Sequence, residues 1–150
     1  MIPLDARIVL DTYVLVKILQ GKALGTAINE RYQLQQRPTT PLISVVTVGE
    51  LRAFSRSAQW GADKKSRLDA LLAEFVQVDI SSPDVINAYA DLSTFLKSRG
   101  RAVGDNDRWI AATARVLQAT VLTNDGDFSP LHPDQVSVEL VDEAALLADT

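Results

Sequence analysis

Short apolar runs alternate with segments of helical periodicity along the chain. The apolar runs are rich in Val, Ile and Leu, which suit strands of a buried or half-buried sheet. These runs fall at residues 7–10, 42–43, 76–80, 120–123 and 136–141. Between them, apolar residues three and four positions apart predict helices. The expected helices cover residues 12–20, 23–36, 44–57, 62–75, 83–99 and 107–118, with a turn or short helix at 127–131 and a short helix or tail at 143–150.

Strands that alternate with helices predict an α/β fold. In such folds the sheet is mainly parallel and flanked by helices on both faces. The chain has 150 residues, which is enough to bury a substantial core. Neither an internal repeat nor a low-complexity segment divides it, so residues 1–150 are expected to form a single domain.

Acidic residues gather at the ends of several predicted elements. Asp11 directly follows the first strand, and Asp125 follows the strand that ends at Thr123. Asp107 opens a helix, and Glu50 lies in the early turns of another. In open α/β sheets, ligands bind beyond the carboxyl ends of the strands, where the following helices begin. These four carboxylates, from four separate segments, are therefore expected to converge at one edge of the sheet.

Two of these acids also have a purely structural interpretation. Asp11 suits the N-cap of the helix that follows it. Glu50 completes the pattern Thr47-x-x-Glu50, which fits a capping box. A cap at Ser44 is equally available, and it would place Glu50 about two turns into the helix and free it for other work. The sequence leaves both alternatives open.

A carboxylate cluster of this kind favours a hard divalent cation. Crowded carboxylates repel one another and raise each other's pKa, so they are tolerated where a cation holds them. Mg²⁺ and similar ions choose oxygen ligands. The absence of cysteine and the presence of one histidine, His132, disfavour zinc. Mg²⁺ or Mn²⁺ held by such acids can activate a water molecule and cleave phosphodiester bonds.

The overall charge changes this picture little. A net charge of −4 argues weakly against a nucleic-acid partner. If four of the 19 acids occupy one site, the remaining 15 balance the 15 Lys and Arg residues. The lack of cysteine fits a reducing compartment. No signal peptide or membrane-spanning apolar run is evident, so a cytoplasmic protein without a membrane anchor is expected.

Four stretches carry a resemblance to the PIN-domain family, and it extends over nearly the whole chain. The stretches are Val9–Leu15, Ser44–Leu51, Asn106–Ala114 and Leu122–Phe128. The third contains Asp-x-x-Ile-Ala-Ala, the most distinctive piece. Each stretch alone is a weak signal, but all four stand in the order and at the separations of the family. The length resembles that of the VapC-type toxins of bacterial and archaeal toxin–antitoxin pairs.

The resemblance implies a three-layer PIN-like fold and a Mg²⁺- or Mn²⁺-dependent endoribonuclease. By this resemblance, the metal-binding and catalytic acids are Asp11, Glu50, Asp107 and Asp125, with Asp127 as a fifth acid or a support of its loop, and with Thr12 and Asn124 as supporting neighbours. The resemblance also implies a homodimer, an RNA substrate and a small cognate antitoxin. Such antitoxins commonly lay a C-terminal segment over the acidic groove.

Tyr13 departs from the family pattern, because relatives usually carry a small polar residue there. Its ring is expected either to stack on a base or to pack in the core. The basic residues available for RNA are Lys17, Lys22, Arg52, Arg56, Arg101 and Arg108. Arg52, Arg56 and Arg108 are the candidate RNA contacts, and a solvated face or ion pairs are the alternative.

Other functional classes fit less well. A haloacid-dehalogenase-like phosphatase needs an aspartate two residues after Asp11, where Tyr13 stands. A receiver domain needs a late lysine after a strand, and no lysine follows Lys97. The alternative of another class is a non-catalytic PIN-like module that binds RNA or protein. The intact set of acids disfavours it.

Overall fold

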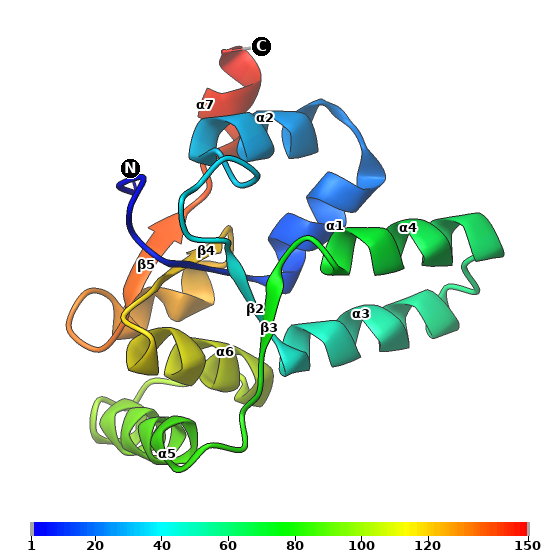
Figure 1. The fold of residues 1–150 in the computed structure, drawn as a ribbon. Helices are drawn as coiled ribbons and strands as arrows, with labels where there is room; N and C mark the ends of the chain where they lie inside the picture. Colours follow the sequence, from blue (N-terminus) through cyan, green and yellow to red (C-terminus); the bar gives the residue numbers. More distant parts are fainter. Residues whose placement is uncertain (1, 150) are drawn as a thin grey trace.

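The structure, a computed structural model, describes residues 2–149 of the chain. Parallel strands form one five-stranded sheet in the order β3-β2-β1-β4-β5 (Figure 1). The strands are β1 (Ile8–Leu10), β2 (Leu42–Ser44), β3 (Val76–Val78), β4 (Thr120–Thr123) and β5 (Ser137–Leu140). Every neighbouring pair is parallel, so the carboxyl ends of all five strands lie along the same edge. The predicted parallel sheet is confirmed.

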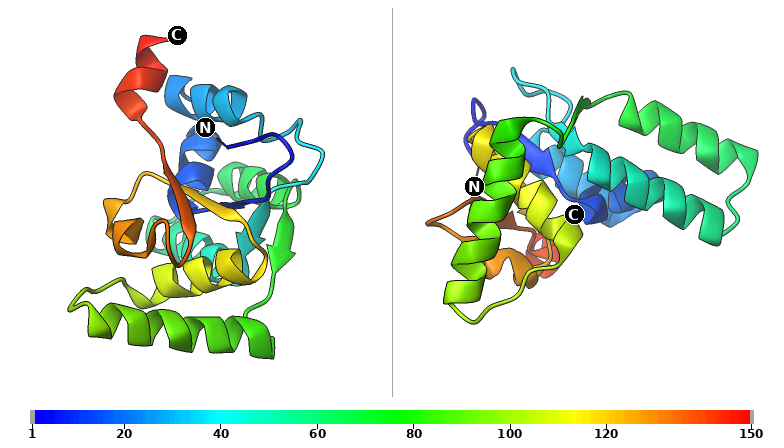
Figure 2. Two further views of the ribbon diagram at one scale, coloured as in Figure 1. Left: turned by 90° about the vertical axis from the view of Figure 1, so that its left-hand side faces the viewer. Right: turned by 90° about the horizontal axis from the view of Figure 1, so that it is seen from below.

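Helices cover both faces of this sheet, which confirms the three-layer α/β fold (Figure 1). They are α1 (Thr12–Gln20), α2 (Ala23–Tyr32), α3 (Val45–Ser57), α4 (Ala62–Leu72), α5 (Pro83–Ser98), α6 (Asp105–Val116), the 3₁₀ helix η1 (Gly126–Leu131) and α7 (Glu143–Ala148). Figure 2 shows α3 and α4 projecting from the sheet in the same direction. Within residues 2–149, no helix is both long enough and apolar enough to cross a membrane.

Two hydrophobic cores lie on opposite faces of the sheet. Side chains alternate along a strand, so Ile8 and Leu10 of β1 enter one core and Val9 enters the other. The first core is built with α1, α2, α3, α4 and α7, and the second with α5, α6 and η1. The small residues of α6, among them Ala111 and Ala114, are completely buried, so this helix packs close to the sheet.

The element boundaries differ from the prediction in a few places. The helix expected over residues 23–36 ends at Tyr32, because Gln33 adopts a left-handed conformation with φ 53°. The helix expected to begin at residue 107 begins at Asp105, and the one expected to end at Phe75 ends at Leu72. α1 ends as predicted, with Gly21 in the left-handed region at φ 68°. Of the predicted C-terminal segment, Thr150 lies outside the described residues.

Candidate active site at the carboxyl edge of the sheet

Asp11 lies at the junction of β1 and α1 and is almost completely buried, with 7% of its surface exposed. It is the N-cap of α1, and its Oδ1 accepts a hydrogen bond of 2.8 Å from the backbone N–H of Thr12. Its Oδ2 accepts one of 2.6 Å from the hydroxyl of Thr123. Burial raises the pKa of Asp11, the two hydrogen bonds oppose that effect, and the charges of Glu50 and Asp125 add to it.

Thr123 is a supporting residue that sequence reasoning missed. It is the last residue of β4 and is completely buried. Its Oγ1 donates to Asp11 and accepts a hydrogen bond of 3.0 Å from the backbone N–H of Asp125. The hydroxyl therefore joins two of the candidate acids. The sequence does carry a signal for it: a polar residue ends a buried apolar strand just before an acid.

Glu50 lies in the second turn of α3 and is half-buried. Ser44 caps this helix, since its Oγ accepts a hydrogen bond of 3.1 Å from the N–H of Val46. The cap at Ser44 is thus the correct alternative, and Glu50 is free to face the site. The hydroxyl of Thr12 donates to Oε1 of Glu50 at 2.9 Å and lies 3.4 Å from the buried hydroxyl of Thr47.

Asp107 lies in the first turn of α6, half-buried at the same edge. Its pKa is raised from the usual 3.8 to about 7. Burial is the largest cause, and the charges of Asp11, Asp125, Glu50 and Asp127 follow in that order. The carboxylates are therefore close enough to repel one another, as expected from the sequence. An open depression of about 420 Å³ beside them is lined by Glu50 and residues 104–107.

Asp125 caps the 3₁₀ helix η1, and its Oδ1 accepts a hydrogen bond of 2.9 Å from the N–H of Asp127. Asp125 is half-buried, whereas Asp127 is exposed and contributes its charge from the rim. Asn124, predicted as a supporting neighbour, is exposed. The buried hydroxyl of Thr123 holds this turn instead.

The donor set fits a hard divalent cation. The four acids and the threonines that hydrogen-bond to them offer carboxylate and hydroxyl oxygens, which Mg²⁺ and Mn²⁺ accept as ligands. Within residues 2–149, no three acidic or histidine side chains are yet arranged tightly enough to hold one ion. Ligation would draw together carboxylates that otherwise repel, and this repulsion adds to burial in raising the pKa of Asp107.

Tyr13 follows Thr12 in the first turn of α1 and points elsewhere. It is half-buried and packs against the first core, in line with one of the two alternatives expected for it. Its hydroxyl donates a hydrogen bond to the carboxylate of Glu143, the first residue of α7. Burial and this carboxylate raise the pKa of Tyr13. The tyrosine thus connects the start of α1 to the C-terminal helix.

Two of the three arginines predicted to contact RNA are engaged in ion pairs. Arg52 pairs with Asp69 of α4, and Arg108 pairs with Asp105 in its own helix. Arg56 is exposed near the end of α3. The structure therefore favours the ion-pair alternative for Arg52 and Arg108.

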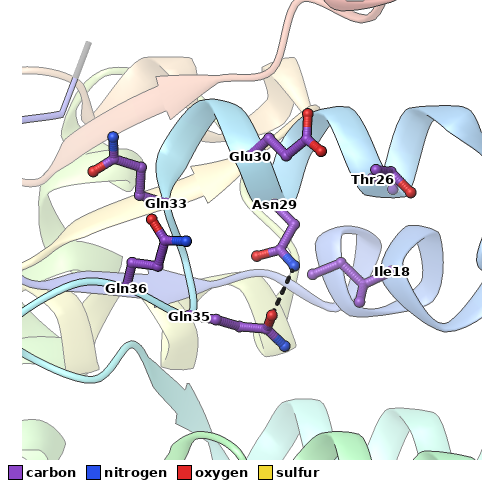
Figure 3. Close-up of a pocket in the computed structure, with 8 residues that line it drawn as sticks. Ile18, Thr26, Asn29, Glu30, Gln33, Gln35 and Gln36 are labelled. Carbon is purple, nitrogen blue, oxygen red and sulfur yellow. Dashed lines mark hydrogen bonds between the residues drawn. The ribbon is translucent and has the colours of Figure 1, made fainter.

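A separate cavity of about 590 Å³ lies away from these acids (Figure 3). It is lined by Ile18, Gly25, Thr26, Asn29, Glu30, Gln33, Gln35 and Gln36. The amide of Asn29 donates a hydrogen bond of 3.2 Å to Gln35 across it. None of the four clustered acids lines this cavity, so the candidate active site is the acid cluster at the carboxyl edge of the sheet.

Comparisons with known proteins identify the family and the fold. The PIN domain family model matches residues 8–131. The chain is 33% identical over 135 residues to Ribonuclease VapC5 of Mycobacterium tuberculosis, which covers 89% of this chain and 93% of that protein. The structure resembles VapBC2 of Rickettsia felis, solved with a DNA fragment from its promoter, with a TM-score of 0.78 and 25% identity over 91% of this chain and 99% of that one. It also resembles VapBC-5 of Mycobacterium tuberculosis, with a TM-score of 0.65 and 29% identity over the same shares. The chain therefore belongs to the PIN-domain family, among the VapC ribonucleases.

Proposed function

We propose that this chain is a metal-dependent endoribonuclease, the toxin of a VapBC-type toxin–antitoxin pair. The observation that carries the proposal is the convergence of Asp11, Glu50, Asp107 and Asp125 from four separate segments, with the pKa of Asp11 and Asp107 raised. Burying and crowding carboxylates costs folding free energy, whereas a cation site requires carboxylates that lie close together. The similarity to VapC ribonucleases supports the same conclusion.

These four acids are the proposed ligands of Mg²⁺ or Mn²⁺. The bound ion would activate a water molecule and neutralise charge on the scissile phosphate. The Thr12 N–H and the Thr123 hydroxyl fix both oxygens of Asp11, and the Thr12 hydroxyl orients Glu50. Asp107, whose pKa is about 7, must give up its proton to serve as a ligand near neutral pH.

The partners follow from the same family membership. Solved relatives are VapBC complexes, and VapBC-5 is described as a member of a family of toxin–antitoxin systems. For this chain, the proposed partners are an RNA substrate, a small cognate antitoxin and a second copy of the chain in a homodimer. Residues 1–150 are proposed to form one PIN domain that acts in the cytoplasm.

The test is expression of the chain in a bacterium, with Asp107→Asn as the inactive variant and Asp91→Asn as the control. Asp91 is an exposed acid of α5. We expect growth arrest from the wild type and from Asp91→Asn only. The purified protein should cut RNA into defined fragments with Mg²⁺ or Mn²⁺ and leave it intact in EDTA. Equal growth of all strains, without metal-dependent cleavage, would favour a non-catalytic PIN-like module that binds RNA or protein.

A further inference from the structure

The first turn of α6 carries two acids and has no side-chain cap. Gly104 occupies the N-cap position, where it provides no side-chain hydrogen bond. Asp105 and Asp107 both lie in this turn. Successive residues of a helix are rotated by about 100°, so these two carboxylates leave the helix on nearly opposite sides. Asp107 faces the other carboxylates, and something must hold the turn in that orientation.

Arg108 ties this turn to α5. Its Nη2 donates to the carboxylate of Asp105, and its Nη1 donates to Oγ of Ser93 on α5 at 2.8 Å. Its guanidinium lies over the ring of Tyr89, 4.9 Å from the centroid. The Arg108 side chain is 21% exposed, and the Asp105 side chain is 75% exposed. One arginine thus bridges two helices through three different contacts.

The partners of Arg108 are themselves connected. The hydroxyl of Tyr89 also donates to Asp105, at 3.3 Å, and the hydroxyl of Ser93 donates to the backbone carbonyl of Tyr89 at 2.8 Å. The ring of Tyr89 stacks on Trp109 with centroids 3.9 Å apart and an interplanar angle of 18°. The α5–α6 contact therefore fixes the position of the carboxylate of Asp105 from two sides.

This arrangement commits Arg108 to contacts within the protein. Both of its terminal nitrogens donate to protein oxygens. Its Nε is buried and has no hydrogen-bond partner among residues 2–149. Releasing the guanidinium for RNA would break the link to Ser93 and free the charge of Asp105 beside the site.

We propose that Arg108 is a positioning residue of the metal site: it holds Asp105 against α5 and so keeps Asp107 turned toward Asp11. The role rests on the proposed function, because it concerns the orientation of a proposed ligand. Residues that orient metal ligands commonly affect metal affinity 10–100-fold. Arg108 acts through the helix turn, so the lower end of that range is expected.

The test is Mn²⁺ binding by the purified full-length protein, followed by the electron paramagnetic resonance signal of free Mn²⁺. Arg108→Gln should weaken binding about tenfold. Arg108→Lys should also weaken it, since one ammonium cannot reach both Asp105 and Ser93 in the planar geometry of a guanidinium. Arg67→Gln is the matched control, because Arg67 is an exposed arginine of α4. It should bind Mn²⁺ as the wild type does.

A second measurement separates positioning from RNA contact. A labelled single-stranded 20-nucleotide RNA of mixed sequence is bound in EDTA at a series of KCl concentrations. Loss of one phosphate contact lowers the slope of log affinity against log salt concentration by about one. Arg108→Gln should leave this dependence unchanged if its role is positioning. A reduced salt dependence with normal Mn²⁺ binding would overturn the proposal and restore Arg108 as an RNA contact.

Reference variants make the outcomes distinct. Asp107→Asn should lose most Mn²⁺ binding; if it binds as the wild type does, the proposed metal site fails, and the positioning role fails with it. If Asp107→Asn loses binding while Arg108→Gln and Arg108→Lys keep it, only the positioning role is refuted. Should Arg108→Gln fail to fold in a urea titration, Arg108→Lys and Ser93→Ala decide the question, and normal Mn²⁺ binding by both would refute it.

Discussion

Asp107→Asn should stabilise the metal-free protein at pH 8. The pKa of Asp107 is about 7 in the folded chain, against the usual 3.8. Between pH 4 and pH 7, the folded state therefore binds more protons than the unfolded state, and the free energy of unfolding falls as the pH rises. Above pH 7 the carboxylate is ionised, and the free energy cost of holding its charge in the folded state is fully present. Asn carries no charge, so the variant avoids this penalty.

The size of the effect follows from the displacement of the pKa. About three pH units at ~1.4 kcal/mol each give an upper limit of about 4 kcal/mol. Asp107 is only half-buried, and water screens part of the repulsion, so we expect about 2 kcal/mol. In a domain of this length, that gain raises the melting temperature by about 4–8 °C.

Thermal unfolding in EDTA at pH 4 and pH 8 measures this difference. The variant should melt higher than the wild type at pH 8, and the gap should nearly close at pH 4, where Asp107 is protonated. Asp91→Asn, at an exposed site of α5, should shift neither value. If Asp107→Asn melts at or below the wild type at pH 8, the carboxylates do not repel in the folded protein and the proposed cluster is wrong.

Four further predictions concern the metal, a buried hydroxyl and two glycines. At pH 8, Mg²⁺ or Mn²⁺ at 100 times its dissociation constant should stabilise the wild type by about 2.7 kcal/mol, and EDTA should reverse this in a melting scan. Thr123→Val should cost about 2–3 kcal/mol in a urea titration, because Oδ2 of Asp11 and the N–H of Asp125 lose a buried partner; a loss below half of this would refute the central role of the hydroxyl. Gly25→Ala should cost about 1–3 kcal/mol, since the added carbon would lie 2.2 Å from a carbonyl oxygen of α1. Gly49→Ala meets nothing within 4 Å and should instead gain up to about 1 kcal/mol of helix stability.

The parts of the fold that follow local rules could be predicted from the sequence. β4 spans Thr120–Thr123 as expected, because its apolar run is bounded by polar residues. The end of α2 could not be predicted, because glutamine is not a residue type that usually adopts the left-handed conformation found at Gln33. A side-chain contact from the following loop contributes there: Nη1 of Arg37 donates to the carbonyl of Tyr32 at 2.8 Å. Which side chain returns to the end of a helix is not set by helix propensity.

The candidate site divides in the same way. Each clustered acid directly follows a strand or lies in the first two turns of a helix, so its edge of the sheet is set by chain order alone. The hydrogen bond from Thr123 to Asp11 and the one from Arg108 to Ser93 of α5 depend on which groups meet across elements. Chain order gives the edge on which a residue lies, but not its partner. Arg108 therefore had the same sequence signal as an exposed arginine.

Asp11 shows that the structural and the functional interpretation of one residue can both hold. It caps α1 and also stands among the clustered acids. Its carboxylate accepts hydrogen bonds from the Thr12 N–H and the Thr123 hydroxyl. Asn at this position keeps the cap, but its side chain has only one acceptor oxygen. Its NH₂ group would therefore face the hydroxyl of Thr123, whose oxygen already accepts a hydrogen bond from the N–H of Asp125. The relief of repulsion is then offset by a disturbed buried hydrogen bond.

At pH 8, Asp11→Asn should therefore gain less than half of the stability that Asp107→Asn gains. Both variants should abolish cleavage. The same melting scans in EDTA measure the two gains side by side. An equal or larger gain from Asp11→Asn would mean that charge repulsion alone governs the stability of the site. A smaller gain would mean that the hydrogen bonds to Asp11 already offset much of its charge, which leaves Asp107 as the acid most dependent on the cation.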